Sequence, residues 1–104
     1  MKLVILESPY AGDAERNVTY ARACMRDCLQ RGEAPMVSHL IYTQVLNDDV
    51  PEERRLGIDA GLAWGCRADL TAVYIDHGIS GGMKHGIANA EAAGRPIEYR
   101  RLAT

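Results

Sequence analysis

The sequence has no long hydrophobic run, because none of its apolar stretches approaches the ~20 residues that span a bilayer. A basic segment followed by an apolar one is also missing from its start, so we expect no signal peptide and no membrane partner. Basic residues are not in excess either, since 12 Lys and Arg stand against 14 Asp and Glu. Proteins that bind the phosphate backbone of nucleic acids usually need such an excess. Nucleic-acid binding is therefore not expected, whereas a small phosphorylated ligand needs only one or two local groups.

Cysteine is scarce, and the three cysteines are Cys24, Cys28 and Cys66. Cys24 and Cys28 are separated by a helical spacing rather than by the CxxC spacing of redox or zinc pairs. We interpret all three as buried, reduced thiols of a cytoplasmic protein. The pattern predicts neither a metal site nor a cofactor.

The composition is that of an ordinary globular domain. The chain has 104 residues, of which 47% are hydrophobic and 25% charged. This length corresponds to a single domain over residues 1–104.

Short apolar runs alternate with amphipathic stretches along the chain. Strands are predicted at 2–6, 34–38, 70–75 and 96–99, and helices at 13–31, 51–65 and 80–94. Residues 39–50 are expected to be irregular. This alternation predicts an α/β fold, a three-layer Rossmann-like or flavodoxin-like sandwich of about four parallel strands with helices on both faces.

Boundary residues support these helices. Asp13 and Ser80 are good N-caps, and Gly32 and Gly94 are natural stops. Pro51 suits a first helical turn. The glycines at 57, 61 and 65 indicate close packing of one helix against a neighbour.

In such a sheet, ligands bind beyond the carboxyl ends of the strands. The rule selects residues 7–13, 38–49, 76–82 and the region near 100. Glu7 and Asp76 are acids at strand ends within this set. Glu7 is suited to contact a ligand or to pair with a neighbouring Arg, and Asp76 to contact a substrate or to close a turn.

The chain contains an SPYxG loop at 8–12, a DDxPEER helix start at 48–54, and a GMxxGI segment at 82–87. These three motifs resemble those of the nucleoside 2-deoxyribosyltransferase-like superfamily, in particular of its small phage and bacterial proteins. The segments 78–83 and 94–97 strengthen the resemblance, which covers nearly the whole chain.

The resemblance implies cleavage or transfer at the N-glycosidic bond of a deoxynucleoside or its 5′-monophosphate. In that family a glutamate on the third helix attacks the anomeric carbon. The equivalent position here is Gly86, which cannot act as a nucleophile. A serine-x-glycine that holds phosphate in the monophosphate hydrolases matches Ser80 and Gly82. Relatives are dimers or larger, so a homo-oligomer is expected.

Asp76 is the candidate that could replace the missing catalytic carboxylate. Tyr10 could stack on a base, and His39 could bond a base or a sugar. The acids at 48, 49, 52 and 53 form either a solvated loop and helix cap or a contact with a sugar hydroxyl or a base, which could cross a subunit boundary. The predicted ligand-binding residues are Ser8, Tyr10, Gly12, His39, Asp49, Asp76, Ser80, Gly82 and Met83.

These observations leave three functional hypotheses. The first is an N-glycosidase or deoxyribosyltransferase acting on a nucleoside or nucleotide. The second is a non-catalytic nucleotide binder, for example a phage protein that sequesters a nucleotide signal. The third is a protein-interaction module with an idle pocket.

Overall fold

A computed structural model describes residues 1–102 as alternating strands and helices. The strands are β1 (Leu3–Glu7), β2 (Ala34–Met36), β3 (Leu70–Tyr74) and β4 (Ile97–Arg100). The helices are α1 (Ala14–Gln30), α2 (Ser38–Ile41), α3 (Pro51–Gly65) and α4 (Gly81–Ala92), with a 3-10 turn η1 (Tyr42–Gln44). No helix in this part of the chain is long and apolar enough to cross a membrane.

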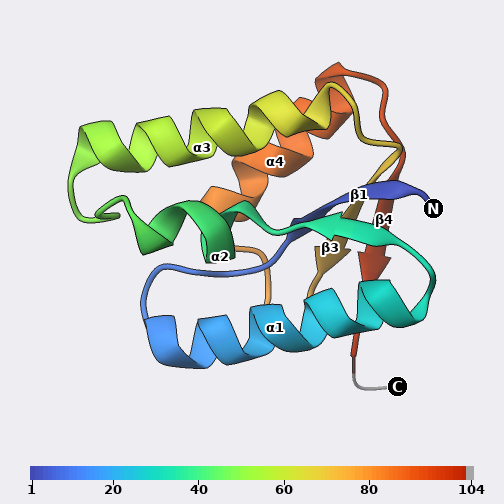
Figure 1. Cartoon of the computed structure of the whole chain (residues 1–104), viewed down its shortest axis with the longest axis horizontal. Coiled ribbons are helices and arrows are strands. Elements are labelled where there is room, and N and C mark those ends of the chain that lie inside the picture. The colour runs from blue at the N-terminus through green and yellow to red at the C-terminus, as the bar shows by residue number, and fades with distance from the viewer. Residues whose placement is uncertain (103–104) are drawn as a thin grey trace.

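The four strands form one parallel sheet in the order β2-β1-β3-β4. The chain moves from β1 to one edge and then crosses to β3 on the other side of β1. Because parallel crossovers are right-handed, this reversal puts helices on opposite faces. Figure 1 shows α1 on one face and α3 and α4 on the other. The predicted three-layer α/β fold is confirmed.

The side chains of the two central strands point alternately to the two faces of the sheet. Val4 and Leu6 of β1 and Tyr74 of β3 pack into one hydrophobic core with buried residues of α1 such as Cys24. Successive side chains of a strand point to opposite faces. Glu7, which follows Leu6, therefore points towards the face covered by α3 and α4.

The predicted helix boundaries hold because their chemistry is local. Asp13 Oδ1 accepts a hydrogen bond from the Arg16 amide, and Ser80 Oγ accepts one from the Met83 amide. Gly32 and Gly94 follow their helices with φ of 79° and 68°, a conformation that glycine adopts without steric cost.

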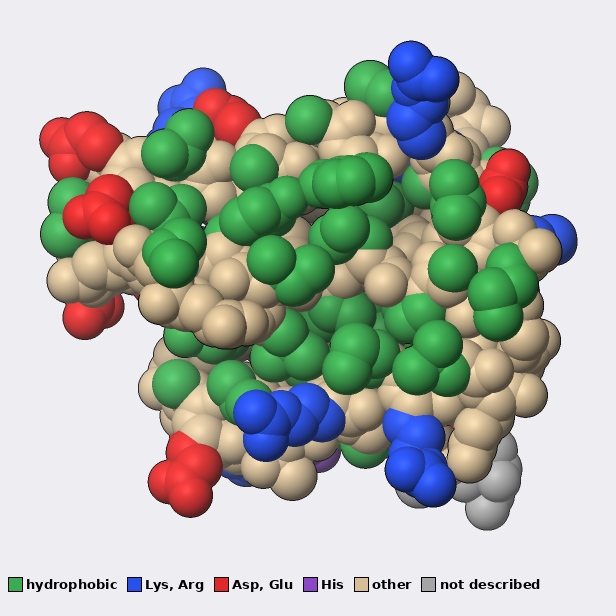
Figure 2. Space-filling model, viewed as in Figure 1, with side chains coloured by type: hydrophobic (Ala, Val, Ile, Leu, Met, Phe, Trp, Pro, Cys, Tyr) green, Lys and Arg blue, Asp and Glu red, His purple; other side chains and the backbone are tan. Residues whose placement is uncertain are grey.

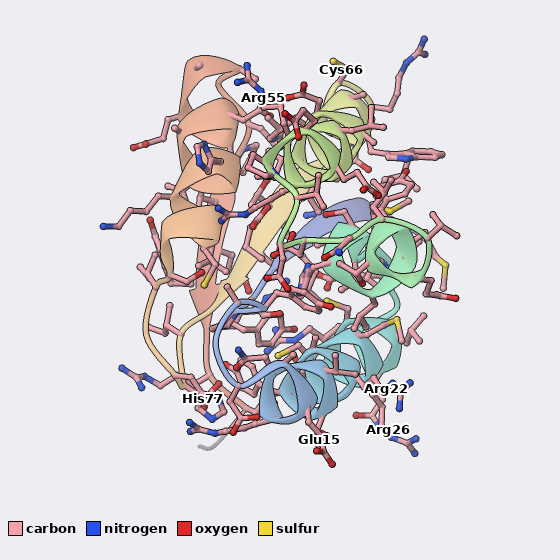
Figure 3. The ribbon with its side chains drawn as sticks, turned by 90° about the vertical axis from the view of Figure 1, so that its left-hand side faces the viewer. Glu15, Arg22, Arg26, Arg55, Cys66 and His77 are labelled. Carbon is pink, nitrogen blue, oxygen red and sulfur yellow. The ribbon has the colours of Figure 1, made fainter. Side chains whose placement is uncertain are left out.

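Two sequence interpretations need correction. Residues 38–44, expected to be irregular beyond Ser38, form α2 and η1. Cys66, expected to be buried, is exposed at the end of α3, whereas Cys24 and Cys28 are buried. Figure 3 shows Cys66 at the outer edge of the molecule.

The glycines of α3 allow close packing, as their spacing predicted. A side chain at Gly61 would lie 2.9 Å from the Ser38 Cβ, and one at Gly57 would touch Leu46 and Tyr42. Because α2 and η1 are short, their position depends on this contact with α3 rather than on their own helix propensity.

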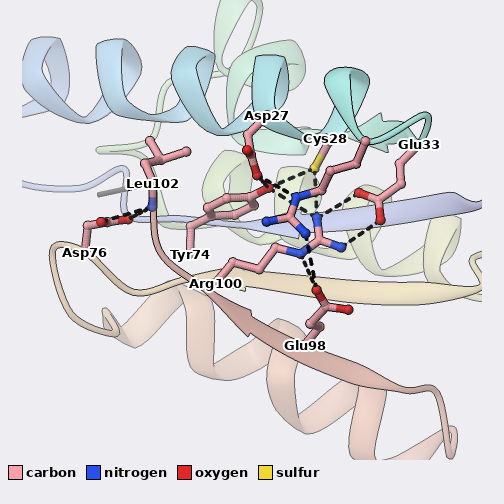
Figure 4. A network of polar contacts seen from close by, with 9 residues as sticks. Asp27, Cys28, Glu33, Tyr74, Asp76, Glu98, Arg100 and Leu102 are labelled. Atoms are coloured by element: carbon pink, nitrogen blue, oxygen red, sulfur yellow. Dashed lines mark hydrogen bonds and ion pairs between the residues drawn. The ribbon is translucent and has the colours of Figure 1, made fainter. Parts of the chain in front are cut away.

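A buried polar network joins β4 to α1 (Figure 4). The Arg100 guanidinium donates to both carboxylate oxygens of Glu33 at 2.7 Å. The Tyr74 hydroxyl accepts from Arg100 and donates to Asp27 at 2.6 Å. Hydrogen bonds from Arg100 lower the pKa of Glu33, so this pair is charged and satisfied inside the fold.

Candidate functional site

A cleft of about 190 Å³ opens beside the carboxyl ends of β1 and β2, under α3 and against the start of α4. The sheet rule predicts a ligand site at this edge, next to the point where the strand order reverses. Eighteen residues line the cleft, and its polar or aromatic side chains and the start of α4 include Glu7, Ser8, Tyr10, His39, Tyr42, Asp48, Glu53, Arg54, Ser80, Gly81, Gly82 and Met83.

One end of the cleft is the N-terminus of α4. The first amides of an α-helix have no partner within the helix. Ser80 satisfies that of Met83, but the amides of Gly81 and Gly82 have no hydrogen-bond partner among residues 1–102. Both glycines line the cleft and carry no side chain to obstruct it. This end is suited to an anionic group, which the helix dipole also favours.

The loop after β1 forms another wall. Ser8 Oγ and His39 Nε2 lie 2.6 Å apart and share a hydrogen bond. The Tyr10 ring stands edge-on to the His39 ring, with centroids 6.4 Å apart. Burial lowers the pKa of His39 to about 4. The imidazole is therefore neutral near pH 7 and can donate or accept hydrogen bonds without adding charge.

Polar groups on the outer rim come from α3 and the preceding loop. Arg54 Nε lies 3.8 Å from Asp48 Oδ2. Glu53 Oε1 accepts a hydrogen bond from the Asn47 amide at 3.1 Å. Asp48 and Glu53 are therefore already engaged in local contacts. Arg54 is the one Arg or Lys among the lining residues that the structure describes.

Glu7 supplies the inner carboxyl of the cleft. It also lines a smaller cavity of about 60 Å³ behind it, together with Gly86 and Arg95. No side chain between residues 1 and 102 donates a hydrogen bond to this carboxyl. Burial raises the pKa of Glu7 to about 8, although the positive charge of Arg95 acts in the opposite direction.

Asp76, the predicted catalytic residue, lies elsewhere. The Tyr20 hydroxyl donates to Asp76 Oδ1 at 2.6 Å, and the Leu102 amide donates to both carboxylate oxygens. Figure 4 shows the contact with Leu102. Asp76 thus faces α1 and the segment after β4, and it is not among the residues that line the cleft.

The other predicted ligand contacts divide into two groups. Six line the cleft together: Ser8, Tyr10, His39, Ser80, Gly82 and Met83. Gly12 and Asp49 are not among its lining residues, and Asp48 lines it where Asp49 was expected. Met83 is buried, and its amide and sulfur bond Ser80, so it shapes the helix start.

Glu7, Tyr42 and Arg54 line the cleft but were not among the predicted ligand-binding residues, although the sequence left Glu7 open as a ligand contact or a partner of an Arg. The signal for Glu7 is an acid that ends an apolar strand, a place where a ligand contact is expected. Tyr42 and Arg54 had no comparable signal: Tyr42 lies in η1, which was not predicted, and Arg54 lies in the first turn of α3. Within residues 1–102 no three metal-binding side chains lie close enough together to hold an ion.

Comparison with known proteins gives a family but no activity. A family model described as a domain of unknown function, DUF7768, matches residues 2–100. None of the curated proteins is similar enough to count as a match. The matched range includes every residue of the cleft and all four strands, so the chain belongs to the DUF7768 family.

Proposed function

We propose that the cleft binds a nucleoside or nucleotide and that the protein cleaves or transfers at its N-glycosidic bond. One observation supports this most strongly: the cleft brings together a helix start suited to an anion (Gly81 and Gly82), an aromatic wall (Tyr10) and an inner carboxyl (Glu7). A nucleoside 5′-monophosphate has the matching parts, which are a phosphate, a flat base and a sugar carbon that becomes cation-like during cleavage.

Each part of such a ligand has a suitable partner. Gly81 and Gly82 would receive the phosphate through their amides. Tyr10 offers a ring face or edge to the base. Neutral His39 is suited to hydrogen bonding with a hydroxyl or a ring nitrogen. This assignment agrees with the chemistry implied by the resemblance to the deoxyribosyltransferase-like superfamily.

A thermal-shift titration with the four deoxynucleoside 5′-monophosphates and their nucleosides tests binding. A ligand that binds only the folded state raises the apparent stability. Gly82→Asp should abolish the shift given by monophosphates, because its carboxylate repels phosphate. The same substitution should not weaken the fold, since an acid in the first turn favours the helix dipole. Gly82→Asn is the matched control for size. No shift with any compound would contradict the proposed site.

A non-catalytic nucleotide binder is the second candidate, and Gly86 favours it. The position at which the resemblance implies a nucleophilic glutamate carries no side chain. Such a protein would show the thermal shift but would release no free base. Chromatography of the ligand after incubation separates the two candidates.

We also propose that the protein forms a homo-oligomer. Apolar side chains gather over the face that carries the edge strand β2 (Figure 2). Leu3 and Trp64 are about half exposed there, beside a shallow depression that Pro35 and Met36 also line. Light scattering should give the mass of a dimer or larger, and Trp64→Lys should shift it towards the monomer.

A further inference from the structure

Glu7 and Gly86 compete for one volume in the fold. A methyl group placed on Gly86 would overlap Oε2 and Cδ of Glu7 and would lie 2.9 Å from Oε1. The carboxyl that ends β1 therefore stands where a side chain of α4 would begin. Any residue larger than glycine at 86 would displace it.

This carboxyl differs from the other acids of the cleft. Asp48 pairs with Arg54, and Glu53 accepts from the Asn47 amide. Glu7 has no such hydrogen bond among the described residues, and it lines the cleft as well as the cavity behind it. It is the acid that remains available to a bound ligand.

Arg95 does not neutralise it by direct contact. Its guanidinium donates to Thr71 Oγ1, to the Gly65 carbonyl and to Asn89 Oδ1, at 2.9, 2.7 and 2.9 Å. These bonds fix the cation behind Glu7 and leave the carboxyl facing the cleft. Such an arrangement keeps a carboxyl in place without binding it tightly, as a nucleophile requires.

We propose that Glu7 is the catalytic nucleophile of this chain, a carboxylate supplied from the end of β1 in the space that Gly86 leaves open. This inference rests on the proposed function, because it assigns a residue to the cleavage of the glycosidic bond. It differs from the sequence prediction, which placed the carboxylate at Asp76.

The reaction is a displacement at C1′ of the sugar. An oxygen of ionised Glu7 forms a bond to C1′ while the bond from C1′ to the base nitrogen breaks. The electron pair of that bond leaves with the base, which takes a proton from solvent. Water then attacks C1′, the bond to Glu7 breaks with its electron pair returning to the carboxylate, and the surplus proton goes to solvent.

The ionised form of Glu7 must attack, so base release should increase with pH up to about 8. The pH profile of kcat/KM reports such a group in the free protein. Other titratable or charged groups line the same cleft or cavity as Glu7. They are Tyr10 after β1, His39 of α2, Tyr42 of η1, Asp48 before α3, Glu53 and Arg54 in its first turn, His85 of α4 and Arg95 after it. Glu7→Gln should remove the dependence if Glu7 is its source.

The decisive experiment measures free base and thermal shift on the same full-length samples. Glu7→Gln should reduce base release at least about 100-fold while the shift with deoxynucleoside 5′-monophosphates persists. In the Glu7→Ala background, Gly86→Asp or Gly86→Glu should restore release, because the new carboxyl enters the vacated space. Gly86→Asn and Gly86→Gln are the matched controls, and they should not restore it.

Three results would overturn the assignment. They are undiminished base release by Glu7→Gln, equal rescue by the amide controls, and a wild-type protein that binds monophosphates without releasing base. In the third case nucleotide binding stands and only the nucleophile is lost. Absence of both binding and release removes the proposed function itself, so the two failures are distinguishable. Circular dichroism of each variant verifies that it is folded.

Discussion

Replacement of Glu7 by Gln should remove a loss of stability that the wild-type protein shows as the pH rises. Burial raises the pKa of Glu7 from 4.5 to about 8 in the folded protein, whereas the unfolded chain has the ordinary value. The folded state therefore holds a proton that the unfolded state releases between these pH values. The stability this gives is complete below pH 4.5 and is lost as the pH rises towards 8.

The size of the effect follows from the two pKa values. Each pKa unit corresponds to about 1.36 kcal/mol. Between pH 6.5 and 8.5 the wild-type protein should lose roughly 2 kcal/mol of unfolding free energy through this group. Glu7→Gln has no proton to release, so its stability should be nearly constant across the window. Neutral His39 contributes little change there, because its folded pKa lies near 4.

Urea unfolding followed by circular dichroism at pH 6.5 and 8.5 measures the difference, since a domain of this size is expected to unfold in one step. Glu53→Gln is the matched control. Its carboxyl lies on the rim of the same cleft and bonds the Asn47 amide, so this variant should keep the wild-type decline. Equal pH dependence in the wild type and Glu7→Gln would refute the burial argument.

Three further outcomes are expected. Gly86→Ala should lower the free energy of unfolding by about 1–3 kcal/mol through overpacking, whereas in the Glu7→Ala background it should raise it by roughly 0.5–1 kcal/mol. A double-mutant cycle in urea measures this coupling, and additive effects would contradict the overlap of the two side-chain positions. Glu33→Gln should destabilise by about 3 kcal/mol, because it takes the bidentate partner from the buried Arg100 charge; a urea midpoint unchanged from the wild type would exclude this. The free energy of unfolding of the wild type should fall by about 2 kcal/mol from pH 6.5 to 4.5 through His39, because the folded His39 resists protonation. His39→Gln should remove this part of the decline. Parallel plots of unfolding free energy against pH for the wild type and the variant would contradict the burial of the ring.

The fold was predictable because its signals are local. The apolar runs at 2–6 and 70–75 became the central strands, and Asp13 and Ser80 cap the helices that follow. The segment 38–44 was missed because its short helices have no periodic pattern of their own. They are held by tertiary contacts, with Ser38 packed against Gly61.

Much of the cleft was predictable for a related reason. Parallel strands place their carboxyl ends at one edge, so Ser8, His39 and Ser80 come together from segments that are distant in sequence. Gly12 lies in the loop after β1 and Asp49 in the segment before α3, but both are exposed and neither lines the cleft. The rule identifies the loop, and the backbone path within the loop decides which side chains line the cleft.

The choice between Glu7 and Asp76 could not be made from the sequence. In the sequence both acids follow apolar runs that predict central strands. Such strands are covered on both faces, so they show no alternation that reveals which side a residue faces. The structure places the two acids on opposite sides of the sheet. Glu7 follows Leu6, which packs on α1, and therefore points to α4; Asp76 lies two residues beyond Tyr74 and shares its α1 face.

Gly86 lies next to the Glu7 carboxyl, and its meaning differs between the sequence and the structure. From the sequence alone, a glycine at position 86 indicates that the nucleophilic glutamate implied by the resemblance has been lost. In the structure the Glu7 carboxyl occupies the space that a side chain at position 86 would need. The glycine on α4 is therefore what allows the acid of β1 to lie there. A carboxyl supplied from a strand end is held by the sheet backbone, whereas one on α4 would depend on the helix position. A glycine at an expected catalytic position is thus evidence of lost activity only when no side chain from a neighbouring element fills its place.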